Sequence, residues 1–369
     1  MKAIALVPQT TNIRLVDRRE PEISAANHVK LRVLRVGICG TDREEAAGGR
    51  ADAPPGQKEL VIGHEMIGQV VATGAAVRAV KAGDYAVVTV RRPCGHCQPC
   101  AGDRSDLCES GDYTERGIRH RDGFQTQMVV DEEHYIVKVP ADLGPRAVLT
   151  EPMSVAEKAI DEALKIQKGR LPDASDPVAW LKGKTALVAG LGPIGLLAAL
   201  ALQLRGATVL GLDIVDPSSP RPKLLEQIGG KYVGGPGVKA DCLGEKFGQI
   251  ELIVEATGVA KLEFDLLAAL GINGVYVLTG IPGGDRPVTV DGPTLMRQLV
   301  LRNQVVVGSV NASPKDWQMA VDDLAAAHRQ WPSGVDALVT DSFPYADFAR
   351  ALSHHSADEI KTVIEWGTA

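Results

Sequence analysis

Apolar and polar positions alternate over short segments in the first ~150 residues, the pattern of strands that bury one face. Val29, Leu31, Val33 and Val36 alternate imperfectly with polar residues ahead of the segment GICG. Two further apolar runs, IGQVVATG and YAVVTV, are set apart by Gly-Asp or Pro turns. We therefore expect a largely antiparallel β region with long functional loops.

Around Val155 the apolar spacing changes to the helical period. The apolar positions at this spacing are Val155, Ala156, Ala159, Ile160, Ala163, Leu164 and Ile166. Lys168 and Gly169 supply a helix stop. We expect a helix here, followed by a polar linker in GRLPDASDP.

From Thr185 onward, strand and helix patterns alternate. The expected strands are TALVAG, TVLGLD, IELIVEATG, GVYVLTG and QVVVGSV, and the expected helices are GPIGLLAALALQLRG, one near Leu224 and one from about Lys261 to Leu270. Nearly continuous apolar strands indicate a parallel sheet buried on both faces. After Asn311, a helix near Trp317 and the strand KTVIEW are expected to return to the first domain. The fold class is α/β, with one domain over 1–182 and 312–369 and a doubly wound domain over 183–311.

Composition narrows the class of protein. The 369 residues carry a formal net charge of −6 without a basic block, so we expect no nucleic-acid partner. The longest apolar stretch, around Ile194 to Leu204, is broken by Gln203 and falls short of the ~20 residues that span a bilayer. The N-terminus lacks a signal-peptide pattern. We expect a cytoplasmic enzyme without a membrane partner.

Four of the six cysteines share one short loop, at Cys94, Cys97, Cys100 and Cys108. This spacing is typical of four thiolates around one tetrahedral zinc ion with no open position, so the metal is expected to be structural. Thiolate–metal chemistry in a reducing compartment explains such a knuckle better than disulfides do.

A glycine-rich turn predicts a dinucleotide site. Gly190, Gly192 and Gly195 follow the apolar strand TALVAG directly and open a long helix. The glycines allow a tight turn, close approach of the pyrophosphate and close helix packing. Pro193 and Ile194 begin the helix, whose free N–H groups face the phosphates.

Asp213 ends the next strand, where a carboxylate can accept hydrogen bonds from both ribose hydroxyls. The same charge repels a 2′-phosphate, and Ile214 and Val215 offer no cation for it. We expect NAD in preference to NADP, and NADP stays open if Arg221 or Lys223 folds back into the pocket.

A second metal site is predicted from residues outside the four-cysteine loop. An open zinc site needs about three protein ligands and a vacant position. Cys39, His64 and Glu151 offer a thiolate, an imidazole and a carboxylate, and Glu65 is either a fourth ligand or a partner behind the ligands. Cys39 and His64 lie in Gly-rich turns among acids, unlike Cys242, which we take as structural.

The motifs GICGTD, GHEMIGQV, EPMSVAEKA, GLGPIG, EATG and VGSVN, with the four-cysteine loop, resemble those of the zinc-dependent medium-chain dehydrogenase/reductases. TVRRP, ERGI and LVLRNQVVVGSVNAS resemble the glucose dehydrogenase branch of that superfamily. The resemblance runs from MKAI to KTVIEW. It implies a GroES-like catalytic domain and a Rossmann dinucleotide-binding domain.

The resemblance also implies roles for single residues. The positions of the catalytic zinc are matched by Cys39, His64, Glu65 and Glu151. Thr41 matches the hydroxyl residue that relays a proton, and Thr41, Glu115, Glu151 and Asn311 match substrate positions. The cofactor positions are matched by Gly190, Gly192, Pro193, Ile194, Gly195, Asp213, Thr257, Gly280 and Asn311.

The activity implied is zinc-assisted hydride transfer from the anomeric carbon of an aldose to NAD(P), with a lactone as product. D-Glucose, D-galactose and D-xylose stay open as substrates, and so does a polyol or secondary-alcohol dehydrogenase. A catalytically silent member would have lost Cys39, His64 or the glycine motif, and all are present. The family implies a homodimer or homotetramer.

Overall fold

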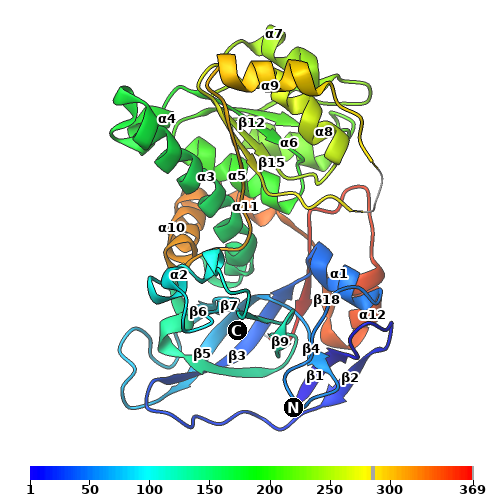
Figure 1. The fold of residues 1–369 in the computed structure, drawn as a ribbon. Coiled ribbons are helices and arrows are strands. Elements are labelled where there is room, and N and C mark those ends of the chain that lie inside the picture. The colour runs from blue at the N-terminus through cyan, green and yellow to red at the C-terminus, as the bar shows by residue number, and fades with distance from the viewer. Residues whose placement is uncertain (284–286, 368–369) are drawn as a thin grey trace. The chain divides into compact units, whose positions relative to one another are not determined.

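The computed structural model describes residues 1–283 and 287–367 (Figure 1). The chain forms two compact units. Unit 1 contains Met1–Ser154, Asn311–His328 and the segment from Val335 onward, and unit 2 contains Val155–Val310 and Arg329–Gly334. The domain boundaries expected after residues 182 and 311 stay a prediction.

The main sheet of unit 1 has the strand order β11-β6-β5-β3-β19-β18, with β10 also paired to β3. Its strands are β3 (His28–Gly37), β5 (Glu65–Thr73), β6 (Tyr85–Val88), β10 (Met128–Glu132), β11 (Ile136–Val139), β18 (Val339–Pro344) and β19 (Lys361–Glu365). All pairs are antiparallel except β18 with β19. The alternating residues Val29, Leu31 and Val33 are fully buried in the core, as the sequence pattern predicts.

Two smaller sheets complete unit 1, in the orders β2-β1-β4 and β7-β8-β9. Their strands are β1 (Lys2–Leu6), β2 (Ile13–Asp17), β4 (Leu60–Val61), β7 (Arg91–Arg92), β8 (Thr114–Arg116) and β9 (His120–Arg121). The helices that lie wholly in unit 1 are α1 (Gly40–Ala46), α2 (Gln98–Ala101) and α12 (Phe348–Ser353).

Unit 2 contains a parallel sheet with the order β14-β13-β12-β15-β16-β17. Figure 1 labels its two central strands, β12 and β15. Its strands are β12 (Thr185–Ala189), β13 (Thr208–Leu212), β14 (Lys231–Tyr232), β15 (Leu252–Glu255), β16 (Val275–Leu278) and β17 (Val305–Gly308). The strand order reverses at β12, with β13 on one side and β15 on the other, which is where ligands bind in open sheets of this type. The expected α/β class is confirmed.

Helices connect the strands of unit 2. They are α4 (Pro177–Leu181), α5 (Pro193–Leu204), α6 (Pro220–Gln227), α7 (Leu243–Phe247), α8 (Ala260–Asp265) and α9 (Gly292–Leu301). Three helices contain residues of both units: α3 (Thr150–Arg170), α10 (Pro314–Gln330) and α11 (Pro332–Asp336). In the described part of the chain, no helix has both the length and the apolar character needed to cross a bilayer.

Three local predictions differ from the structure. The helix expected at Val155 begins at Thr150, because Pro152 lies in the first turn, where its missing N–H has no helical partner. The expected linker GRLPDASDP continues α3 and then forms the 3₁₀ turn η4 (Pro172–Ala174); its Asp176 caps α4 by accepting a hydrogen bond from Ala179 N (3.1 Å). Helix α9 was not expected at all.

A buried charge network joins β10 to β7 and β8. Asp131, which is 3% exposed, accepts hydrogen bonds from Arg92 (2.5 Å) and Arg116 (2.6 Å), and Arg121 lies 3.6 Å away. Burial alone would raise the pKa of the Asp131 carboxyl, but Arg116, Arg92 and Arg121 together lower it to about 2. The network therefore fixes β7, the strand that leads into the four-cysteine loop.

We expect Asp131→Asn to lower the free energy of unfolding by about 3–5 kcal/mol, because it leaves buried arginines without their counter-charge. The folded pKa of Asp131 is depressed, so its contribution is fully present above the unfolded value of about 3.9 and is lost as the pH falls toward 2. Urea unfolding of the wild type and of Asp131→Asn at pH 7, 5 and 3 measures the difference in their free energies of unfolding. A stability difference that stays constant down to pH 3 would contradict the assignment.

Candidate functional site

The four cysteines of the loop converge on one point. The Sγ atoms of Cys94, Cys97, Cys100 and Cys108 all lie within 4.8 Å of one another. The Cys97 and Cys108 sulfurs are 3.9 Å apart, close to the ~3.8 Å edge of a tetrahedron with zinc–sulfur bonds of about 2.3 Å. Helix α2 carries Cys100, and Cys97 is its N-cap. None of the six cysteines forms a disulfide, and this donor set fits a closed structural zinc.

A second cluster consists of Cys39, His64 and Glu65, whose ligand atoms also lie within 4.8 Å of one another. The pairing of β3 with β5 creates it, since Gly37 at the end of β3 lies opposite Glu65 at the start of β5. A side chain at Gly37 would overlap the Glu65 carboxylate. Glycine at position 37 therefore leaves the space that the Glu65 carboxylate occupies.

The His64 ring lies beside the Asp42 carboxylate. His64 Nδ1 and Asp42 Oδ1 are 3.6 Å apart, and both are buried without a hydrogen-bond partner among the described residues. The other Asp42 oxygen accepts a hydrogen bond from Cys39 N (2.7 Å). A ligating histidine usually directs its second ring nitrogen at a carboxylate, so this arrangement fits an imidazole that binds metal through Nε2.

Glu65 is paired with Lys361 at the start of β19. Lys361 Nζ lies 2.7 and 2.6 Å from the two Glu65 oxygens and also donates to Ile38 O (3.1 Å). Both side chains are almost completely buried. Of the two roles left open for Glu65, the ion pair favours a partner that stands behind the ligands.

Glu151 lies in the first turn of α3 and is half-buried. Burial raises the pKa of its carboxyl to about 7, a rise that His64 opposes and Glu65 reinforces. It is not among the three residues whose ligand atoms are mutually within 4.8 Å. The structure thus brings Cys39, His64 and Glu65 together, and ligation by Glu151 stays a prediction.

Two other predicted residues of unit 1 lie in defined surroundings. The Thr41 hydroxyl is 3.9 Å from Cys39 Sγ, at the start of α1. Asn311 has a left-handed backbone (φ 60°) and donates from Nδ2 to Glu115 Oε1 (2.8 Å). The same oxygen accepts hydrogen bonds from Arg91 Nε (3.1 Å) and Nη2 (2.9 Å).

The glycine motif of unit 2 has the geometry that a dinucleotide turn needs. Gly190 follows β12 with φ 89°, and Gly192 is the N-cap of α5, whose first residues are Pro193 and Ile194. A side chain on Gly195 would overlap the Gly190 carbonyl. The N-terminus of α5 therefore stands open at the sheet edge where the strand order reverses.

Asp213 follows β13 and supports that turn. Its Oδ2 accepts a hydrogen bond from Leu191 N (2.8 Å) and its Oδ1 from Ile214 N (2.7 Å). Arg221 Nη1 lies 3.9 Å from Oδ2. The carboxylate is thus fixed beside the glycine turn with one cation near it.

Thr257 and Gly280 lie after the neighbouring strands β15 and β16. Glu255 at the end of β15 accepts hydrogen bonds from Thr257 N (2.5 Å), from the Thr257 hydroxyl and from Gly258 N (3.1 Å). A side chain at Gly280 would collide with Gly258. The two loops pack closely at the carboxyl edge of the sheet.

Sequence reasoning missed Lys361, Asp42 and Arg91. Asp42 had a usable signal, because an acid three residues after an N-cap position forms a capping box. Lys361 showed only as a cation opening an apolar strand, and the Arg91 contact depends on the β7–β8 register.

Comparison with known proteins identifies the relatives of this chain. Residues 144–366 match the family described as "Glucose dehydrogenase C-terminus", and residues 25–141 match "Alcohol dehydrogenase GroES-like domain". Glucose 1-dehydrogenase 2 of Vulcanisaeta moutnovskia is 37% identical over 367 residues, 99% of both chains. Glucose 1-dehydrogenase of Methanocella arvoryzae is 34% identical over 369 residues, 100% of both.

Among solved structures, glucose dehydrogenase of Haloferax mediterranei in complex with NADP, Zn and gluconolactone superimposes with a TM-score of 0.87. The two chains are 31% identical, and the match covers all of both. The expected GroES-like and Rossmann architecture is confirmed.

The two clusters predict two zinc ions per purified chain by elemental analysis. Cys108→Ser should leave about one, because it opens the tetrahedral cage, and Cys39→Ser should also leave about one. Cys242→Ser is the matched control, because Cys242 belongs to neither cluster. The buried structural role expected for Cys242 is wrong, because its side chain is exposed. A wild-type content of one zinc would contradict the assignment.

Proposed function

The chain belongs to the glucose dehydrogenase branch of the zinc-dependent medium-chain dehydrogenases, and we propose that it oxidises the anomeric hydroxyl of D-glucose to the lactone. The full-length likeness to a glucose dehydrogenase solved with gluconolactone supports this reaction. The observation in this chain that carries it is the setting of Glu115.

Glu115 offers one free carboxylate oxygen. Arg91 and Asn311 hold Oε1, whereas no hydrogen bond from the described residues reaches Oε2. A buried carboxylate oriented by one oxygen leaves the other to accept from adjacent hydroxyl groups, as a sugar requires. We assign the sugar hydroxyls to Glu115 and Asn311.

Cys39 and His64, which lie in one cluster with Glu65, would hold the catalytic zinc, and we assign the third ligand position to Glu151 as the family resemblance implies. Glu65, paired with Lys361, would support these ligands. When bound, the zinc supplies Lewis acidity that lowers the pKa of the anomeric hydroxyl, and the nicotinamide ring accepts the hydride. Asp42 holds the Cys39 backbone in position for this role, and its other oxygen lies beside the His64 ring.

We assign the proton transfer to Thr41. Its hydroxyl, next to Cys39, accepts the proton of the anomeric hydroxyl while passing its own outward to water. With a nucleotide bound, the hydride of the anomeric carbon would pass to it, so the products would be the lactone, the reduced nucleotide and one proton. The chain's task is to keep the reacting carbon and the acceptor ring aligned.

For the cofactor, we propose NAD in preference to NADP. Asp213 places a fixed carboxylate beside the glycine turn, where it would accept from ribose hydroxyls and repel a 2′-phosphate. Arg221 is the cation that could offset this charge. The Haloferax enzyme was solved with NADP. Similarity to that enzyme does not decide which nucleotide this chain prefers.

We also propose a homo-oligomer in the cytoplasm. β17 is the last strand of its sheet. Exposed apolar side chains occur on β17, just after it and on the preceding helix α9, namely Met296, Val300, Leu301, Val306 and Val310. An edge strand with apolar neighbours is suited to pairing with a second copy. Light scattering distinguishes a monomer, which would refute this proposal, from a dimer or a tetramer.

The activity is tested by initial rates with D-glucose, D-galactose, D-xylose and sorbitol, each with NAD and NADP. We expect oxidation of aldoses, D-glucose included, and a higher kcat/KM with NAD. Activity on sorbitol alone would overturn the sugar-lactone assignment and favour a polyol dehydrogenase.

We expect Asp213→Asn to lower the ratio of kcat/KM for NAD over NADP by about tenfold, because the amide removes the charge and keeps an acceptor for Leu191 N. Asp216→Asn is the control, an exposed acid of the same loop that bonds Ser218 N (2.8 Å). An unchanged ratio in Asp213→Asn would remove Asp213 from cofactor choice.

A further inference from the structure

We propose that the four-cysteine loop takes part in sugar binding, through Arg91, which acts as a positioning residue for Glu115. The inference rests on the proposed function, because it concerns the same sugar site. It gives the loop a role beyond stabilising its own segment.

The guanidinium group of Arg91 contacts both Glu115 and the four-cysteine loop. Its Nε and Nη2 donate to Glu115 Oε1, and its Nη1 donates to the carbonyl oxygens of Ser105 (3.4 Å) and Asp106 (3.3 Å). Arg91 and Glu115 are directly opposite in the β7–β8 pair, so their side chains share one face. Most of the Arg91 donors are thus committed, and the group is 8% exposed.

The carbonyl groups on the far side of Arg91 belong to the metal loop. Ser105 and Asp106 form the 3₁₀ turn Ser105–Leu107, between the cysteines at 100 and 108. Asp106 is buried and is paired with Arg104 (2.8 Å). The positions of these carbonyls are therefore set by the two cysteines that enclose the turn.

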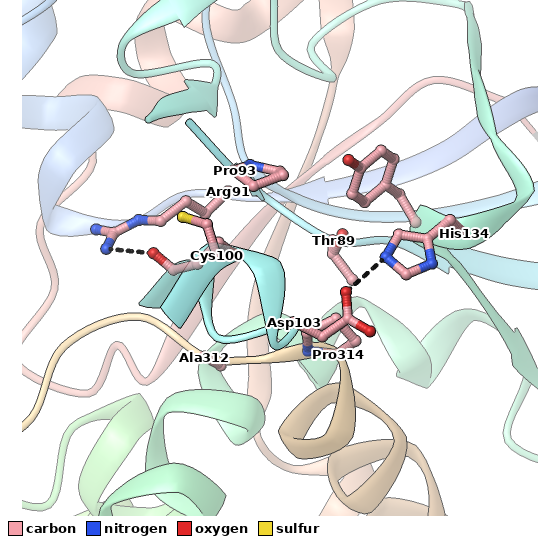
Figure 2. Close-up of a pocket in the computed structure, with 10 residues that line it drawn as sticks. Thr89, Arg91, Pro93, Cys100, Asp103, His134, Ala312 and Pro314 are labelled. Carbon is pink, nitrogen blue, oxygen red and sulfur yellow. Dashed lines mark hydrogen bonds and ion pairs between the residues drawn. The ribbon is translucent and has the colours of Figure 1, made fainter. Parts of the chain in front are cut away.

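A small pocket lies where the four-cysteine loop, Arg91 and the segment after Asn311 meet. Arg91 and Cys100 line it together with Ala312 and Pro314, the residues that follow Asn311 (Figure 2). A zinc ligand, the arginine and the segment that carries the second partner of Glu115 thus meet around one space. Movement of the loop would reach both groups that hold Glu115 Oε1.

The plane of the guanidinium is also fixed. Arg91 stacks on the Tyr113 ring, with 3.8 Å from Cζ to the ring centroid. Arg119 contacts the same ring at 4.8 Å, but its side chain donates to Gly111 O (2.7 Å) and not to Glu115. A lysine at 91 cannot reproduce this planar, forked contact.

The first test is Arg91→Lys. We expect the KM for D-glucose to rise about tenfold with kcat and the KM for the nucleotide little changed, since Glu115 is loosened and the zinc ligands are untouched. Arg119→Lys is the matched control and should keep the sugar KM of the wild type. Equal sugar KM values for Arg91→Lys and the wild type would overturn the inference.

The second test opens the loop with Cys108→Ser and combines it with Arg91→Lys. If the loop acts through Arg91, the double variant raises the sugar KM no further than Arg91→Lys alone. Effects that multiply would show an independent route and overturn the inference. If Cys108→Ser does not fold, the sugar KM values of Arg91→Lys and Arg119→Lys still test the role of Arg91.

Sugar binding is also measured directly, by ligand-observed NMR with D-glucose and cofactor-free, zinc-loaded protein. The dissociation constant should rise about tenfold in Arg91→Lys and stay unchanged in Arg119→Lys. A wild-type protein that binds no sugar would refute the proposed function itself. Wild-type binding with no change in Arg91→Lys would refute only the role of the loop.

Discussion

Lys361 places one buried ammonium group between the chain segments that carry Cys39 and His64, two of the predicted zinc ligands. It donates to the carbonyl of Ile38, the residue before Cys39, and to the carboxylate of Glu65, the residue after His64. Removing one member of such a buried pair leaves an uncompensated charge that costs about 3–5 kcal/mol. The position of both ligands, and hence of everything arranged around them, depends on this contact.

At other places in the chain, too, a single charged side chain holds neighbouring segments together. Arg91 bonds both Glu115 and the carbonyls of the cysteine loop, and Asp131 gathers arginines from three strands or turns. In unit 2, Glu255 and Asp213 use their carboxylates to hold loop N–H groups. These charged groups fix strands and loops that carry or adjoin the residues of the predicted sites.

Local motifs could be predicted from the sequence because their geometry is contained in a few residues. The four cysteines lie within residues 94–108, and the glycine turn directly follows its strand, so spacing alone indicates the chemistry. Lys361 and Arg91 could not be found in this way. Their roles depend on which residues lie opposite each other in sheets, and register is set by the whole fold. The early start of α3 was missed because the expected helix began at Val155, the first residue of the apolar spacing, whereas Pro152 is compatible with the first helical turn.

The two predicted metal sites also differ in when they can form during synthesis. The cysteine cage needs only a short stretch of chain, so its ligands are all present once residue 108 has been made. The partner of Glu65 arrives 296 residues later, on the strand β19 that pairs with β3. The four cysteines could therefore take up their predicted metal early, whereas the pocket for the second predicted metal is completed only after residue 361 has been made.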